Sequence, residues 1–173
     1  MTTYPTVALT GHRPQSLTAQ QAAWVQVTLA LVARRFADVY STRVAVSGLA
    51  LGCDTWWALS ALAAGLELVA FVPFEAQADR WADADRTLWL ALRAAATSET
   101  LVSPGGYDVK ALHARNDMLI RSADAVIAVV RSDKPDGGAA SALGKALAAG
   151  KPVLRMDPIV FTVRWETSPA HAD

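Results

Sequence analysis

Short, continuous apolar runs constrain the fold of this chain more than any other feature of its sequence. Three of them read Val7-Ala8-Leu9, Val44-Ala45-Val46 and Leu68-Val69-Ala70-Phe71-Val72, and a fourth covers residues 125–130. Because no polar residue alternates within them, they predict strands buried on both faces, as in a parallel sheet between two layers of helices. With two less apolar runs, the expected strands are Thr6–Leu9, Arg43–Val46, Glu67–Val72, Thr100–Ser103, Ala125–Val130 and Pro152–Met156.

Alanine-rich stretches with helical ends separate these strands. The first helix is expected to begin at Thr18, which forms a capping box with Gln21. The other expected helices span about Asp54–Gly65, Asp79–Ala96, Val109–Ser122 and Ala139–Ala149. This alternation predicts an α/β, doubly wound three-layer sandwich with a mainly parallel sheet. We expect one domain over residues 1–173, with a core of about 6–157 and an arm, 158–173, that adds an edge strand or a dimer contact.

Charge and composition exclude several classes of protein. Sixteen Lys and Arg residues balance sixteen Asp and Glu residues, whereas a general nucleic-acid binder normally carries a basic excess. The single cysteine excludes an internal disulfide and a cysteine-cluster metal site. No apolar run is long enough for a membrane helix, and the amino terminus lacks the features of a signal peptide. We therefore expect a cytoplasmic protein with no membrane association and no metal.

Polar and glycine residues collect where the expected strands end, and ligands of open parallel sheets bind at that edge. The first strand runs into Gly11, His12 and Arg13, and the fifth runs into Gly137 and Gly138, with Ser141 close behind. The second strand runs into Ser47, Gly48, Gly52 and Asp54. Glycine permits close approach of the backbone, and a helix N-terminus attracts anions. Three such loops on one edge favour a phosphate-bearing ligand, although any single loop is also explained as a tight strand–helix turn.

Several side chains at this edge have two interpretations. Asp54 either caps the second helix or accepts a hydrogen bond from a ribose or base. Glu75 is a ligand residue or a salt-bridge partner, and the two carboxylates form a general acid–base pair only if they meet across the cleft. Arg13 is the best phosphate contact, because a guanidinium matches phosphate geometry. His12 is expected to be neutral and hydrogen-bonded.

Neither the P-loop motif nor the dinucleotide-binding glycine motif is present. Instead, residues 46–54 resemble the Ser-Gly-x-Ala-x-Gly-x-Asp signature of the DprA/Smf Rossmann domain. Residues 10–14, 49–56 and 73–77, with Trp81, resemble the YpsA branch of the same group. His113–Met118, Ala123-Asp124-Ala125 and residues 137–141 resemble the LOG proteins, which cleave cytokinin nucleotides. Over residues 6–155 the chain thus resembles the SLOG superfamily.

This resemblance implies a Rossmann-like fold that binds nucleotides or related ligands at the strand ends, commonly as a homodimer. Gly48, Gly52 and Asp54 match the second-strand loop of the superfamily. Arg115 matches the arginine of the LOG motif, which reaches the ligand if its helix crosses the cleft and otherwise faces solvent. Gly137, Gly138 and Ser141 match the phosphate loop. The catalytic glutamate of LOG enzymes is replaced by Gly144, which argues against their hydrolase activity.

The sequence therefore favours a protein that binds or senses a nucleotide-like ligand, without a cofactor and without turnover. One alternative is a nucleotide-processing hydrolase, with Asp54, Glu75 and Arg115 as catalytic candidates. A second alternative is a DprA-like factor that binds single-stranded DNA. The zero net charge of the chain argues against a nucleic-acid partner. Trp81 is expected in the core, and the apolar helix that begins with Trp56 and Trp57 is expected to be buried, partly in a dimer interface.

Overall fold

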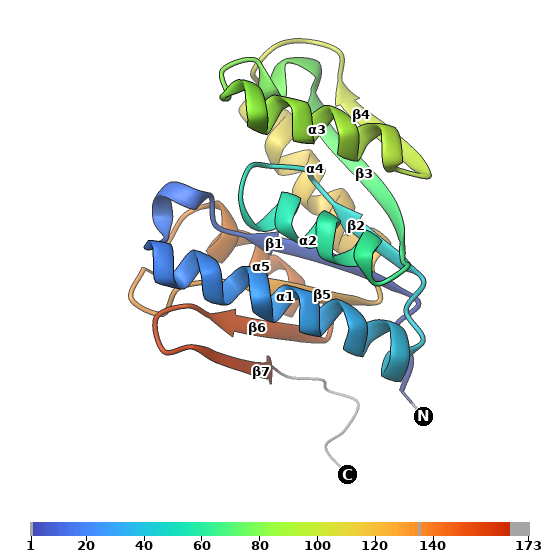
Figure 1. The fold of residues 1–173 in the computed structure, drawn as a ribbon, viewed down its shortest axis with the longest axis vertical. Coiled ribbons are helices and arrows are strands. Elements are labelled where there is room, and N and C mark those ends of the chain that lie inside the picture. Colours follow the sequence, from blue (N-terminus) through green and yellow to red (C-terminus); the bar gives the residue numbers. More distant parts are fainter. Residues whose placement is uncertain (1, 135, 167–173) are drawn as a thin grey trace.

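A seven-stranded sheet organises the structure, a computed structural model that describes residues 2–134 and 136–166 (Figure 1). Six strands are parallel, and only β7 is antiparallel, to β6. The strand order is β4-β3-β2-β1-β5-β6-β7. The strands are β1 (Thr6–Gly11), β2 (Val44–Ser47), β3 (Glu67–Phe74), β4 (Ser98–Ser103), β5 (Ala125–Val129), β6 (Val153–Asp157) and β7 (Thr162–Glu166).

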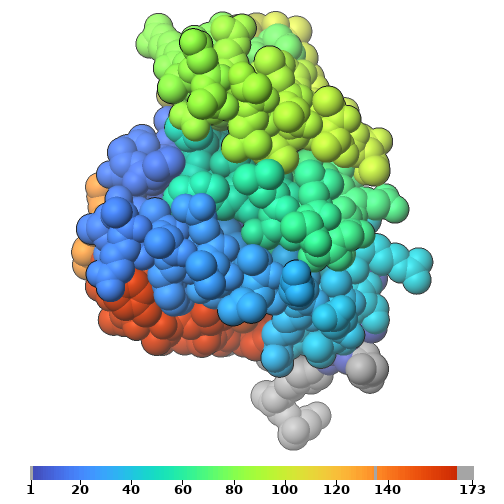
Figure 2. All heavy atoms as spheres, viewed as in Figure 1, coloured from blue at the N-terminus to red at the C-terminus, as the bar shows by residue number. Residues whose placement is uncertain are grey.

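Five α-helices cover the two faces of the sheet, which confirms the predicted doubly wound sandwich. They are α1 (Ala19–Tyr40), α2 (Cys53–Ala63), α3 (Asp83–Ala95), α4 (Val109–Ser122) and α5 (Gly138–Ala148), and two short 3-10 helices span Pro14–Ser16 and Glu75–Ala78. The buried clusters place α1, α2 and α3 on one face, with α4 and α5 on the other. Figure 2 shows atoms of α1, α2 and α3 packed side by side over the first face.

The continuous apolar strands are explained by this two-sided cover. In β1, Val7 and Leu9 belong to the cluster beneath α1 and α2, whereas Ala8 belongs to the cluster beneath α4. All three side chains are at most 1% exposed. Because both faces of these strands are buried, apolar residues occupy consecutive positions instead of alternating with polar ones.

The apolar helix α2 is buried within the chain. Trp57 lies in the cluster shared with α1, and Ala58 lies in the cluster shared with α3. Trp57 is 0% exposed, and Trp56 packs at the edge of the first cluster. Packing between two neighbouring helices and the sheet therefore buries most of this apolar helix, although Leu59 remains 42% exposed.

The start of the third helix differs from the prediction. The third helix begins at Asp83 rather than Asp79, because residues 75–78 form a separate 3-10 turn and the Trp81 ring packs edge-on against Trp89 at 6.3 Å. The helix begins where Asp83 and Asp85 place carboxylates in its first turn, a favourable position in the helix dipole.

The arm after the core adds an edge strand, one of the two expected outcomes. Val163 and Trp165 in β7 pair with Met156 and Leu154 in β6. Residues 167–173 of the predicted arm lie outside the described residues. Within the part of the chain that the structure describes, no helix combines the length and apolar character needed to cross a membrane.

Candidate ligand site at the carboxyl edge of the sheet

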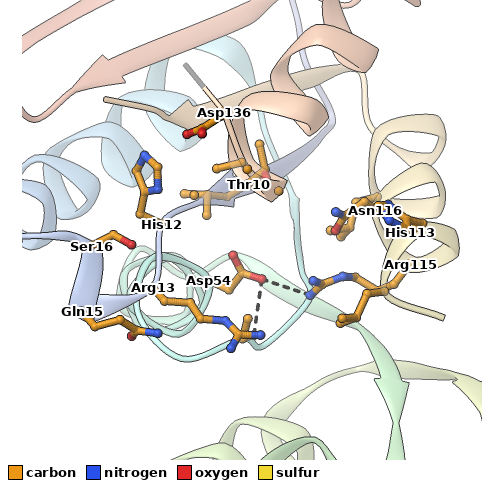
Figure 3. A pocket seen from close by; sticks show the side chains of 18 of the residues that line it. Thr10, His12, Arg13, Gln15, Ser16, Asp54, His113, Arg115, Asn116 and Asp136 are labelled. Carbon is orange, nitrogen blue, oxygen red and sulfur yellow. Dashed lines mark hydrogen bonds and ion pairs between the residues drawn. The ribbon is translucent and has the colours of Figure 1, made fainter. Parts of the chain in front are cut away.

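A cavity of about 320 Å³ opens beyond the carboxyl ends of β1 and β5. The strand order changes direction at β1, since β2 lies on one side of it and β5 on the other. This is the position at which open α/β sheets leave a crevice for ligands. The loop after β1, the start of α5 and one face of α4 line the cavity, and Figure 3 shows their side chains around an open centre.

Glycine at position 11 lets the end of β1 approach the start of α2. A Cβ atom on Gly11 would lie 2.5 Å from the Cβ of Cys53, closer than two carbon atoms can come without displacement. The carbonyl of the next residue, His12, accepts a hydrogen bond from the Cys53 backbone N–H at 3.2 Å. Cys53 is fully buried, and burial raises the pKa of its thiol. It therefore serves as a small packing residue, as expected.

His12 joins the loop after β1 to the loop after β5. Its Nε2 atom accepts a hydrogen bond from the backbone N–H of Arg131 at 3.1 Å, and Arg131 Nη1 donates to the Ser16 carbonyl at 2.6 Å. Burial lowers the pKa of His12, and the nearby cations Arg131 and Lys134 lower it further. Both effects favour the neutral imidazole, which can accept this hydrogen bond.

The N-terminus of α5 faces the cavity without a side-chain cap. Gly137 precedes the helix with φ 93°, a conformation that glycine adopts readily, and no side chain of the described residues caps the helix with a hydrogen bond. The cavity is lined here by Gly137, Gly138 and Ala139. The first N–H groups of a helix have no partner within it and carry the positive end of its dipole. This end of α5 is suited to an anion.

Arg115 forms the opposite wall from the middle of α4. Its side chain is only 9% exposed, and its Nη1 atom donates to the Gly48 carbonyl at 3.0 Å and to Asp54 Oδ2 at 3.2 Å. Within the described residues, its buried Nε atom has no hydrogen-bond partner. A buried N–H group without a partner is costly, so an acceptor that reached it would stabilise this arrangement.

The charge of Asp54 is already matched within the protein. Its Oδ2 atom accepts hydrogen bonds from Arg115 and from the Ala50 backbone N–H, the second at 3.3 Å. Burial raises the pKa of the Asp54 carboxyl, and Arg115, the Ala50 N–H and Arg13 oppose that rise. Asp54 therefore holds Arg115 in place from the first turn of α2, where it does not serve as the N-cap.

In the loop after β2, Ala50 lines the cavity, but the expected residues Ser47, Gly48 and Gly52 do not. Ser47 is buried and uses its hydroxyl within the loop, donating to the Asp54 carbonyl and accepting from the Leu49 N–H. A side chain on Gly48 would collide with the Arg115 guanidinium, and one on Gly52 would meet Pro14 at 2.7 Å. These glycines therefore permit close packing of the loop against Arg115 and Pro14. At the start of α2, the backbone N–H groups of Cys53 and Thr55 already donate to the carbonyls of His12 and Ala50, so these two groups are not available to a ligand.

Glu75 and Ser141, two further expected site residues, lie away from the cavity. Glu75 bonds to Arg93 at 2.8 Å and lines neither this cavity nor its neighbour, so it forms no acid–base pair with Asp54 there. Ser141 is exposed on α5 and does not line the cavity. Trp81 is half-buried against the α3 cluster, as expected, and it also lines a second cavity.

The remaining expected residues line the cavity together. They are Gly11, His12, Arg13, Asp54, Arg115, Gly137 and Gly138. Arg13 is exposed at the mouth and forms no ion pair with any residue that the structure describes. Its charge lowers the pKa of Asp54, which places it near the buried pair, as Figure 3 also shows. It is free to meet a ligand.

Sequence reasoning missed several residues of the cavity. On α4, Leu112, Asn116 and Leu119 line the cavity with Arg115, and their spacing of three and four residues marks one helix face. Lys134 and Asp136 line it from the loop after β5. The helical periodicity around Arg115 would have identified the first group, because residues on the same face share its environment. Across the described ranges, no three His, Cys, Asp or Glu side chains are grouped to hold a metal ion.

Comparison with protein-family models gives no match, and neither does comparison with curated proteins. Solved structures do match. DNA processing protein A (DprA) from Streptococcus pneumoniae aligns with a TM-score of 0.62 and 23% identity, over 87% of this chain and 50% of that one. DprA from Helicobacter pylori, described for its single-stranded DNA binding mode, gives 0.55 and 20%, over 87% and 64%. The molybdenum cofactor carrier protein of Chlamydomonas reinhardtii gives 0.54 and 16%, over 87% and 75%.

This chain has the Rossmann-like fold of those proteins. It spans half the length of the pneumococcal DprA. At these identities the likeness concerns the fold alone.

Proposed function

We propose that this protein binds a small phosphate-bearing ligand, a nucleotide or nucleotide derivative, in the cavity between the ends of β1 and β5. The observation that carries the proposal is the buried Arg115 side chain, whose Nε–H lacks a partner among the described residues and which lines the same cavity as the uncapped start of α5. A phosphate oxygen accepts hydrogen bonds from both kinds of donor.

The charges around the cavity support an anionic ligand. Arg13 and Lys134 line it, and neither forms an ion pair within the described part of the chain. The Asp54 carboxylate is offset by Arg115, which leaves Asp136 as the other acidic side chain of the lining. The helix dipole of α5 adds further positive potential.

A binding measurement tests this proposal. Isothermal titration calorimetry with ribose 5-phosphate and with nucleoside 5′-monophosphates is expected to show binding that weakens at least about tenfold in an Arg13→Ala variant, the scale of one charge-assisted hydrogen bond. An Arg35→Ala variant is the control, because Arg35 is exposed on α1, away from the cavity. Equal loss in both variants, or no binding of any phosphate compound, would overturn the proposal.

A hydrolase is a weaker alternative, with Asp54 as its remaining acid–base candidate. Burial raises the pKa of Asp54 and Arg115 opposes that rise, and Arg115 and Ala50 already occupy its Oδ2 atom. Gly144 is exposed on α5 and does not line the cavity. Release of free base from a nucleoside monophosphate, abolished by Asp54→Asn, would favour the hydrolase over a binding protein.

Single-stranded DNA is a second candidate ligand, supported by the fold shared with two DprA proteins. An exposed Arg13 at the mouth of a cavity is compatible with a phosphate of a DNA strand. Retention of a short oligonucleotide that falls steeply with salt would favour this candidate. The molybdenum cofactor is a third candidate, supported by the fold shared with its carrier protein, and it belongs in the same panel of ligands.

We also propose that the chain is a single-domain, cytoplasmic member of the YpsA-like branch of the SLOG superfamily and forms homodimers. Support for self-association comes from α1, where Val27 is 64% and Leu31 is 65% exposed. Exposed apolar side chains on one helix are candidates for a contact between copies. Sedimentation equilibrium of the wild type and of a Val27→Lys, Leu31→Lys variant would test this point.

A further inference from the structure

A second cavity of about 540 Å³ adjoins the first and has a different chemical character. Three aromatic side chains line it: Phe74 at the end of β3, Trp81 before α3 and Tyr107 before α4. Both cavities share Arg13, Ala50 and Leu112 in their linings. The anionic site and the aromatic cavity are therefore neighbours, with Arg13 at the boundary between them.

The aromatic side chains that line the second cavity pack against neighbouring rings, and Tyr107 is also exposed to solvent. The Tyr107 ring meets Phe74 edge-on at 5.6 Å, yet Tyr107 as a whole is 72% exposed. Trp81 meets the buried Trp89 edge-on at 6.3 Å. Gln77 holds the adjacent wall, because its amide donates to the Gly48 carbonyl and accepts from Trp89 Nε1, both at 3.1 Å. An exposed aromatic ring beside a cavity is available for stacking.

We infer that the second cavity binds a planar, nucleobase-like ring of the same ligand whose phosphate occupies the first cavity. This inference rests on the proposed function and adds the part of the site that binds the ring of the ligand. A volume of this size and an aromatic lining suit a heteroaromatic ring, and ring stacking contributes binding energy with little dependence on the identity of the base. Arg13, at the boundary, lies where the two parts of such a ligand join.

The charges of the second cavity favour a small molecule over a nucleic-acid strand. Arg13 and Arg80 line it, and the carboxylate of Asp79 lies beside Arg80 in the same lining. A channel for single-stranded DNA normally offers a cationic track along the backbone in addition to stacking side chains. The mixed charges at this cavity provide a place for one ring rather than for a succession of phosphates.

Calorimetric titration separates the two parts of the site. The probes are ribose 5-phosphate, the four common nucleoside 5′-monophosphates, the corresponding nucleosides and a ten-nucleotide single strand. At least one monophosphate is expected to bind about tenfold more tightly than ribose 5-phosphate, the scale of one stacked base. Tyr107→Ala and Trp81→Leu are expected to remove this gain while leaving ribose 5-phosphate binding unchanged.

Trp24→Leu is the matched control, because Trp24 is also a half-buried tryptophan but packs against Phe161, away from both cavities. Binding of ribose 5-phosphate as tight as that of every nucleotide would overturn the ring site and leave the phosphate site standing. Tyr107-dependent binding of nucleosides without binding of ribose 5-phosphate would support the ring site and overturn the phosphate site. Tyr107-dependent binding of the single strand that exceeds all monophosphates would overturn the small-molecule inference in favour of DNA.

Discussion

The Nη1 atom of Arg115 lies 3.2 Å from Oδ2 of Asp54, although 61 residues separate them in the chain. Arg115 comes from α4 and Asp54 from α2, helices that cover opposite faces of the sheet. The pair meets beyond the carboxyl ends of the strands, where it closes one wall of the cavity. Its position ties the stability of the fold to the shape of the ligand site.

Removing the cation of this pair is expected to destabilise the protein. Arg115→Met leaves the Asp54 carboxylate buried without its counter-ion, which typically lowers the free energy of unfolding by about 3–5 kcal/mol. Urea unfolding of Arg115→Met, Asp54→Asn and the double variant measures the coupling. The double variant is expected to lose clearly less than the sum of the two single losses. Additive losses would mean that the two side chains do not act as a pair.

Glycine at position 48 is expected to be required for packing rather than for ligand contact. Gly48→Ala drives a methyl group into the Arg115 guanidinium, and overpacking of this kind costs about 1–3 kcal/mol of unfolding free energy. The control is Gly144→Ala at an exposed position of α5, where an added Cβ meets no atom of a neighbouring element of the described chain within 4 Å. This substitution is expected to stabilise the helix by about 0.5–1 kcal/mol. Equal thermal stability of the two variants would contradict the packing role.

Because His12 is neutral in the folded protein, we expect the free energy of unfolding to fall in mild acid. The pKa of folded His12 is below its ordinary value of 6.5, so the unfolded chain takes up the proton first as pH falls below that value. Proton uptake also removes the acceptor for the Arg131 N–H. The melting temperature is expected to fall between pH 7 and pH 5, and to fall less in a His12→Gln variant. An identical pH profile in the variant would show that His12 does not contribute.

Glu75 is expected to have no part in ligand binding. Arg93 lowers the pKa of Glu75 through their hydrogen bonds, and Arg93 also bonds to Glu99. The Glu75 side chain is 59% exposed, so Glu75→Gln is expected to lower the free energy of unfolding by less than about 1 kcal/mol. Affinity for nucleoside monophosphates should match the wild type in calorimetric titration. A loss of affinity in this variant would show that Glu75 does take part in ligand binding.

The sequence predicted the layers and the edge of the sheet that carries the cavity, because both follow from local patterns. Continuous apolar runs such as residues 125–129 identify strands covered on two sides, and their carboxyl ends locate the loops. The beginning of α3 was missed because Trp81 belongs to a tertiary contact with Trp89 that helical periodicity cannot reveal.

The individual site residues were harder to predict, because one sequence pattern serves two purposes. Gly48 and Gly138 both belong to glycine-containing segments that lead from a strand into a helix, yet Gly48 makes room for Arg115 and Gly138 lines the cavity. Only the three-dimensional path of α4, which brings Arg115 against the loop after β2, separates these roles. The aromatic cavity was missed for a similar reason, since Phe74, Trp81 and Tyr107 come from separate segments of the chain.

Nuclear magnetic resonance tests the central claim most directly. Titration of the isotope-labelled protein with ribose 5-phosphate is expected to shift the backbone amide signals of Gly138 and Ala139 and the Nε–H signal of Arg115. These groups line the cavity, and the Arg115 Nε–H gains the acceptor that it lacks within the described chain. Unchanged signals at all three groups, or shifts confined to residues outside the cavity, would contradict the phosphate site.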